Sequence, residues 1–182
     1  MNSREEVEKI LGYKHSTFSI DINGYHFILL GTDLKNEIGI EQGGIRKTQS
    51  ISDKDLEWIK NDLSNNQLPC LIFTHFGIAE DNMEKNWWFE KNPQSALLTN
   101  RMAVKQILKN DKNVIAVFSG HQHWTKMIKE DGISYYVVGS LIENINNDGI
   151  PDGVYFEVNL EAEKIDVIEH HISLNRNLFD KE

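Results

Sequence analysis

Residues 114–127, VIAVFSGHQHWTKM, join an apolar run, a glycine and two closely spaced histidines. The run lacks polar alternation, which is typical of a strand buried on both faces of a sheet. Residues 69–77, PCLIFTHFG, contain a second such run, and it also ends at a histidine. In α/β sheets, functional residues gather at the carboxyl ends of adjacent strands. His75, His121 and His123 are therefore predicted to converge at one end of the sheet.

Three converging imidazoles suit a transition-metal ion of the Zn, Mn or Fe type. Gly120, directly before the histidine pair, allows the backbone to turn sharply there. Spacing alone leaves open the alternative that the three are packing residues, because no carboxylate accompanies them. Four other histidines lack this pattern and are interpreted as surface or packing residues: His15, His26, His170 and His171.

The segments around the two apolar runs alternate between hairpins and helices. Asn23-Gly24 and Asp131-Gly132 are turn signals between β-rich segments, and Ser52 is placed to cap a helix. The expected elements are hairpins at 17–31, 125–140 and 153–171, helices at 53–63 and 100–109, buried strands at 69–74 and 113–120, and a loop at 32–51. This order predicts one α/β domain over residues 1–182, with a mixed sheet that needs cover on both faces.

Composition narrows the classes of partner. The 182 residues carry a formal net charge of −9, which argues against nucleic acid or an anionic membrane surface as a partner. Cys70 is the only cysteine, so neither an intrachain disulfide nor a thiolate metal site is expected. No run approaches the ~18 apolar residues that span a bilayer, and the charged N-terminus does not resemble a signal peptide. We expect this polypeptide to be cytoplasmic, without a membrane partner.

Several of these segments, taken in order, resemble a known family. LIFTHFG at 71–77, a helix, VIAVFSGHQHWTKM at 114–127 and YYVVGS at 135–140 resemble the C-terminal half of calcineurin-like metallophosphoesterases. The resemblance covers roughly residues 17 to 140, and Gly120 to His123 match the family's Gly-His-x-His motif. It implies a sandwich of mixed β-sheets flanked by helices, with a two-metal site between the sheets.

The resemblance also implies roles for the histidines and a reaction. His75 and His121 would bind one divalent metal of the Zn, Mn or Fe type, and His123 would bind another. The pair of metals would activate a water molecule that hydrolyses a phosphoester substrate.

The family's three earlier motifs, Asp-x-His, Gly-Asp and Gly-Asn-His, do not occur in this sequence. We therefore expect residues 1–182 to be the C-terminal portion of such a domain, with impaired or no activity and incomplete metal occupancy. Two alternatives stay open: a non-catalytic binding or structural domain, and a mononuclear hydrolase with three histidine ligands. Reading the coding frame upstream would show whether the missing motifs are encoded there.

Two further sets of residues are weaker candidates for the site. Trp87, Trp88 and Phe89 in a polar insertion could line a substrate entrance, although aromatic residues pack against their own domain at least as often. Four polar residues in predicted loops could approach the histidines, but their spacing gives no specific support: Asp33, Asp81, Asn144 and Asp152.

The sequence also predicts self-association. The two apolar runs need cover on both faces, and part of that cover in the family comes from the N-terminal half. We expect a homodimer formed through the surface that this half would cover. Residues 2–11, NSREEVEKIL, have helical character and are a candidate for exchange between the two copies.

Overall fold

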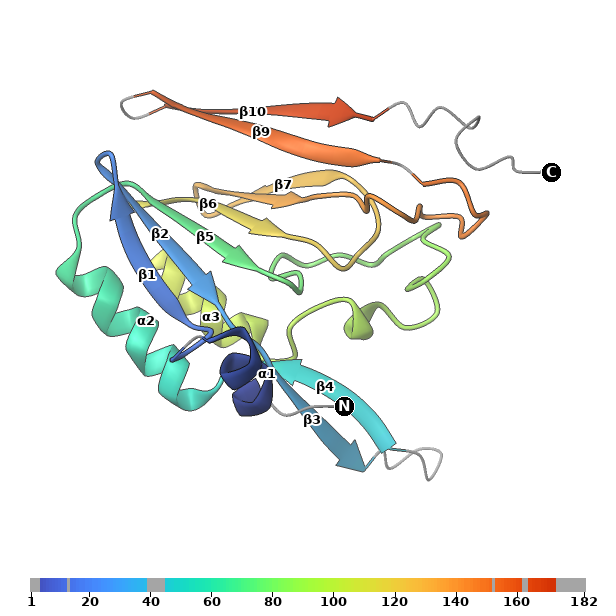
Figure 1. The fold of residues 1–182 in the computed structure, drawn as a ribbon, viewed down its shortest axis with the longest axis horizontal. Helices are drawn as coiled ribbons and strands as arrows, with labels where there is room; N and C mark the ends of the chain where they lie inside the picture. The colour runs from blue at the N-terminus through green and yellow to red at the C-terminus, as the bar shows by residue number, and fades with distance from the viewer. Residues whose placement is uncertain (1–3, 13, 39–44, 152, 162–163, 173–182) are drawn as a thin grey trace.

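The computed structural model describes residues 4–12, 14–38, 45–151, 153–161 and 164–172, with the backbone alone for 35–38 and 45–48. Within them, six strands form a mixed sheet in the order β1-β2-β5-β6-β8-β7 (Figure 1). Strands β2, β5, β6 and β8 are parallel, and β1 and β7 are antiparallel edges. The strands are Phe18–Ile22 (β1), Tyr25–Leu30 (β2), Cys70–Thr74 (β5), Val114–Ser119 (β6), Lys126–Glu130 (β7) and Ile133–Val137 (β8).

Two helices, α2 (Asp53–Asn65) and α3 (Arg101–Lys109), cover one face of the sheet (Figure 1). Ser52 caps α2, since its hydroxyl accepts a hydrogen bond from the Asp55 backbone nitrogen at 3.0 Å. The core on this side joins Ile59 of α2 to Ile72 of β5, with other apolar side chains of both layers around them. The predicted helices and buried strands are confirmed. The apolar residues that predicted them are the ones that pack between the helices and the sheet.

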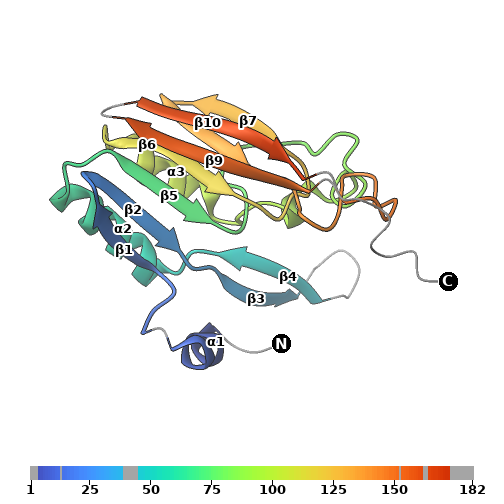
Figure 2. The same cartoon turned by 45° about the horizontal axis from the view of Figure 1, so that its top comes forward.

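A two-stranded ribbon, β9 (Val154–Glu161) and β10 (Lys164–His171), covers part of the opposite face (Figure 2). Aromatic rings form a row beneath it across four strands, with centroids 6.3 Å apart for Phe27 and Phe73, 5.2 Å for Phe73 and Phe118, and 5.1 Å for Phe118 and Tyr136. Phe156 of β9 meets Tyr136 at 6.2 Å. Each such pair adds about 0.5–1.5 kcal/mol beyond the burial of its area.

The tight turns occur where the sequence predicted them. Asn23 and Gly24 have φ values of 50° and 84°, and Asp131 and Gly132 have values of 50° and 85°. Consecutive positive φ angles are the geometry of a type I′ turn, whose twist matches that of the strands it joins. These two turns fix the registers of the β1–β2 and β7–β8 hairpins.

The prediction of a loop at 32–51 is wrong. The segment forms a separate antiparallel ribbon, β3 (Asp33–Ile38) and β4 (Ile45–Ser50), which extends away from the main sheet (Figure 1). Its sequences, DLKNEI and IRKTQS, lack the apolar alternation by which a half-buried strand is recognised. The pairing of the backbone defines these strands, and composition alone indicates a loop.

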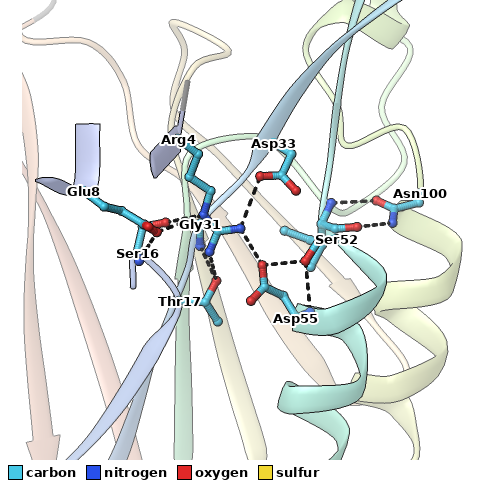
Figure 3. A network of polar contacts seen from close by, with 10 residues as sticks. Arg4, Glu8, Ser16, Thr17, Gly31, Asp33, Ser52, Asp55 and Asn100 are labelled. Atoms are coloured by element: carbon cyan, nitrogen blue, oxygen red, sulfur yellow. Dashed lines mark hydrogen bonds and ion pairs between the residues drawn. The ribbon is translucent and has the colours of Figure 1, made fainter. Parts of the chain in front are cut away.

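Helix α1 (Arg4–Leu11) confirms the helical character expected near the N-terminus, and Arg4 fastens it to the domain (Figure 3). The Arg4 guanidinium donates to Asp55 Oδ2 at 2.5 Å, to Thr17 Oγ1 at 3.0 Å and to Asp33 Oδ1 at 3.3 Å. No residue of α1 is buried, so these polar contacts replace the usual apolar docking of a helix. A further helix, η1 (Pro93–Ser95), is a single 3₁₀ turn. None of the helices among the described residues has the length and apolar character that a membrane crossing requires.

Candidate metal centre

The ends of β5 and β6 bring His75 and His121 to the same edge of the sheet. The two strands are parallel neighbours, with Phe73 opposite Phe118. Beyond the strands, the Gly120 nitrogen donates to the His75 carbonyl oxygen at 3.1 Å, which ties the two strand-end loops together. The nearness of His75 and His121 therefore follows from the pairing of β5 with β6, as the sequence predicted.

The three imidazole rings lie close together. The ring centroids are 4.9 Å apart for His75 and His121, and 6.3 Å apart for His121 and His123. His121 and His123 both have left-handed backbones, with φ values of 64° and 56°. This region is unfavourable for residues with a side chain and is held by the surrounding structure, often at functional sites. Alternate residues of the turn thus direct their rings toward the strand end.

Gln122, between the two histidines, is the residue that packs this turn into the domain. Its side chain is buried, and its Oε1 accepts from Trp124 Nε1 at 3.0 Å. Its backbone oxygen accepts from Nδ2 of the fully buried Asn86 at 2.7 Å. A Cβ placed on Gly77 would lie 2.0 Å from Gln122 Nε2, so only glycine leaves room for this side chain. The sequence carried no signal for Gln122 or Asn86.

Aromatic side chains pack around the histidines. His121 has Phe76 at 4.3 Å and Phe89 at 5.1 Å between ring centroids, and His123 has Trp88 at 4.8 Å. Trp88 and Phe89 therefore contact the candidate histidines, and a substrate entrance lined by the insertion stays a prediction.

The environment of the site lowers the pKa values of His121 and His75. Burial is the main cause for His121 and lowers its pKa to about 4, helped by the rings of His75 and His123 and opposed by a hydrogen bond with the Ser95 backbone. Burial also lowers the pKa of His75, and His123 contributes. Both rings are consequently neutral at pH 7, the form in which an imidazole nitrogen binds a metal.

Two buried polar atoms at this edge have no hydrogen-bond partner among the described residues: Thr74 Oγ1 and His123 Nδ1. Glu143 Oε2 lies 2.9 Å from His123 Nδ1, the distance of an ion pair with a protonated ring. Buried polar groups are nearly always partnered, so unpartnered ones mark a place for an ion, water or ligand. Glu143 was not predicted, because its contact joins segments 20 residues apart through an irregular loop.

The residues present fit a divalent metal in part. A neutral His75–His121 pair and a third imidazole form a nitrogen donor set suited to Zn, Mn or Fe. Within the described part of the chain, however, no three His, Cys, Asp or Glu side chains are arranged closely enough to form a ready metal cluster. The structure thus brings the predicted histidines together without a completed coordination sphere.

The polar residues considered as further candidates have other partners. Asp33 binds Arg4, and Asp81 Oδ2 lies 2.7 Å from Lys126 Nζ. Asn144 holds the insertion through its backbone oxygen, which accepts from Trp88 Nε1 at 2.7 Å. Asp152 lies outside the described residues.

The four remaining histidines lie elsewhere, and His15 is in the segment between α1 and β1. His26 is buried between two carboxylates, and His170 and His171 lie on β10 beside Glu157 and Glu169.

Comparison with known proteins supports the fold. No protein-family model matches the sequence, and no curated protein matches it. Among solved structures, a dimetal phosphatase from Danio rerio matches with a TM-score of 0.56 and 15% sequence identity. The chain shares its fold with this structure over the matched part. This confirms the predicted class, an α/β arrangement of mixed sheets with flanking helices.

The match spans part of each chain. It covers 80% of this chain and 59% of that structure. At 15% identity it establishes the fold. Site chemistry and activity therefore rest on the residues themselves.

Proposed function

We propose that this chain is a divalent-metal-binding domain of the phosphoester hydrolase type. His75 and His121 would hold one cation, and His123 would contribute to a second position. The observation that carries the proposal is the 4.9 Å separation of the His75 and His121 rings at the sheet edge of a dimetal phosphatase-like fold. Neutral rings in that arrangement can offer one nitrogen each to a shared ion.

The chain's own residues would bind and orient the metal. The hydrogen bond from Gly120 to the His75 carbonyl keeps the two ligand loops in register. Phe76 and Phe89 pack against His121 and Trp88 packs against His123, while His75 stays exposed. When bound, the metal would supply charge that binds a phosphoryl group and lowers the pKa of a water molecule. Glu143, beside His123 Nδ1, would orient that ring or accept its proton.

The absence of a ready cluster among the described residues favours weak binding and low turnover for this polypeptide. A non-catalytic metal-binding domain is therefore the second candidate function. It shares the metal site with the first candidate but predicts no hydrolysis. A mononuclear site with all three histidines is a third arrangement, and it predicts one ion per chain.

Metal titration of the dialysed protein by calorimetry, followed by an assay with p-nitrophenyl phosphate, separates these candidates. We expect Zn²⁺ or Mn²⁺ to bind at about one ion per chain or fewer, because only the imidazole donors are in place. His121→Ala should weaken binding by more than the roughly 10–100-fold that loss of an outer partner costs. His171→Ala is the matched control, since His171 is an exposed histidine on β10.

Each outcome bears on one candidate. Turnover that depends on His121 supports the hydrolase, and His121-dependent binding without turnover supports the binding domain. Equal losses on replacing His75, His121 or His123, at one ion per chain, support the mononuclear site. Metal affinity that is unchanged in His121→Ala contradicts the proposal itself.

A further inference from the structure

Exposed apolar side chains occur in the two segments that contact His123, those of Trp88 and Glu143. Trp87, Leu141 and Ile142 are 61%, 54% and 76% exposed, and we call these three the Trp87 rim. Ile142 is next to Glu143, whose carboxylate faces His123 at 2.9 Å. Large apolar groups left exposed beside polar ligands are typical of a surface that binds something.

The position of Trp87 relative to the histidines is fixed by neighbouring rings. The Trp87 and Trp88 centroids are 5.0 Å apart with the rings nearly perpendicular, and Trp88 meets His123 at 4.8 Å. Trp87 is thus the second ring outward from His123. A group attached to a ligand at His123 would extend past Trp88 to reach Trp87.

Hydrogen bonds between two loops hold this arrangement. The Trp87 nitrogen donates to the Ile145 oxygen at 2.9 Å, and Trp88 Nε1 donates to the Asn144 oxygen at 2.7 Å. Asn86, fully buried, anchors the insertion to the histidine turn through Gln122. An exposed tryptophan on a preorganised frame offers a flat apolar surface with little ordering cost on binding.

From this geometry we infer that the Trp87 rim binds the planar aromatic alcohol part of an aryl phosphoester whose phosphoryl group lies at the histidines. The inference rests on the proposed function and adds the class of substrate. Indole faces stack on planar rings whatever their substituents, and Leu141 and Ile142 add apolar contact at the edge. Phosphoesters of small alcohols would reach the histidines but not the rim.

Two non-hydrolysable probes test the inference by calorimetry on the metal-saturated protein. Naphthylmethylphosphonate carries both the anionic group and a planar ring, and methylphosphonate carries the anionic group alone. We expect the naphthyl compound to bind about tenfold more tightly than methylphosphonate, the scale of one aromatic stacking contact. Trp87→Ala should remove that preference and leave the affinity for methylphosphonate unchanged.

Two variants control for loss of folding and for general surface effects. Trp87→Phe keeps an aromatic face and should keep most of the preference. Tyr155→Ala removes an exposed aromatic ring on β9 that stacks on His170 of β10, and it should change neither affinity.

Equal affinities for the two phosphonates, or a preference that survives in Trp87→Ala, would overturn the inference and leave the proposed function intact. Failure of both probes to bind the metal-saturated protein would overturn the inference and the hydrolase candidate, leaving the non-catalytic metal-binding domain.

Discussion

At the scale of single residues, the site depends on a turn in which a buried glutamine separates two histidines. The histidines could be predicted, because a glycine and histidines directly after a buried strand form a local pattern. Gln122, Asn86 and Glu143 could not, since their contacts come from loops without periodicity. Left-handed φ angles at His121 and His123 likewise belong to the folded turn and have no sequence signal.

Gly77 provides a direct test of how tightly this turn is packed. An added Cβ would meet Gln122 Nε2 at 2.0 Å and Leu97 Cδ2 at 2.8 Å. Gly77→Ala should therefore lower the free energy of unfolding by about 1–3 kcal/mol, the usual cost of overpacking. Gly120→Ala is the matched control, because nothing lies within 4 Å of its added Cβ. Urea unfolding that ranks the two variants equally would contradict this account of the turn.

His26 predicts a pH dependence of stability. Its side chain is 4% exposed, with Nδ1 2.6 Å from Asp21 Oδ1 and Nε2 2.8 Å from Asp62 Oδ2. Burial lowers its pKa, but the two carboxylates outweigh burial, so the pKa is raised. Because the folded pKa exceeds the unfolded one, the stabilisation is complete below about pH 6.5 and is lost as the pH rises through the folded pKa.

Replacement of this histidine should show the same trend. The destabilisation caused by His26→Gln, measured by urea unfolding, is expected to be larger near pH 6 than near pH 9. The exposed His171→Gln variant should show little effect at either pH. A His26→Gln effect that grows with pH would contradict the assignment of a charged imidazole between the two carboxylates.

At the scale of elements, segments with regular apolar spacing, a helix cap or a turn dipeptide could be predicted from the sequence. The polar strands could not. Helix α2 carries its cap at Ser52 and apolar residues at helical spacing, and the I′ turns carry Asn-Gly and Asp-Gly. The β3–β4 ribbon has neither signal, since its strands are polar and pair away from the core. The sequence therefore predicts elements that bury an apolar face and misses one defined by backbone pairing.

Helix α1 should depend on one side chain. It has eight residues and none of them is buried, and isolated helices of that length are marginal in water. Arg4→Met removes the contacts with Asp55, Asp33 and Thr17 and should abolish hydrogen-exchange protection in α1 while the sheet keeps its own. Lys9→Gln, an exposed change on the same helix, should preserve protection. Unchanged exchange in Arg4→Met would show that other contacts hold α1.

At the scale of the whole molecule, the sheet is packed on both faces, which explains why the apolar runs of β5 and β6 suit this fold. Helices cover one face of the sheet, and the β9–β10 ribbon covers part of the other (Figure 2). Cover on both faces could be predicted, because neither run alternates with polar residues. The contribution of the C-terminal ribbon could not, since alternation along a hairpin does not say which surface it covers.

Self-association through the uncovered part of this face remains a prediction. Ile20, Ile22 and Leu29 are exposed on β1 and β2, and β1 is an edge of the described sheet. Light scattering at low micromolar concentration should give about twice the 21.0 kDa of one chain. Ile20→Lys with Ile22→Lys should shift the protein toward monomer, whereas Met102→Lys, on exposed α3 surface, should not. A wild-type monomer would contradict the prediction.

The central claim is that the strand-end histidines form a metal site, and paramagnetic Mn²⁺ tests it most directly. In histidine-labelled protein, substoichiometric Mn²⁺ should first broaden the ring signals of His75, His121 and His123. The signals of His15, His170 and His171 should stay sharp. Their rings lie outside the cluster and report nonspecific binding to this acidic chain, whose net charge is −9. Uniform broadening of all histidines, or broadening that spares His75 and His121, would contradict the account.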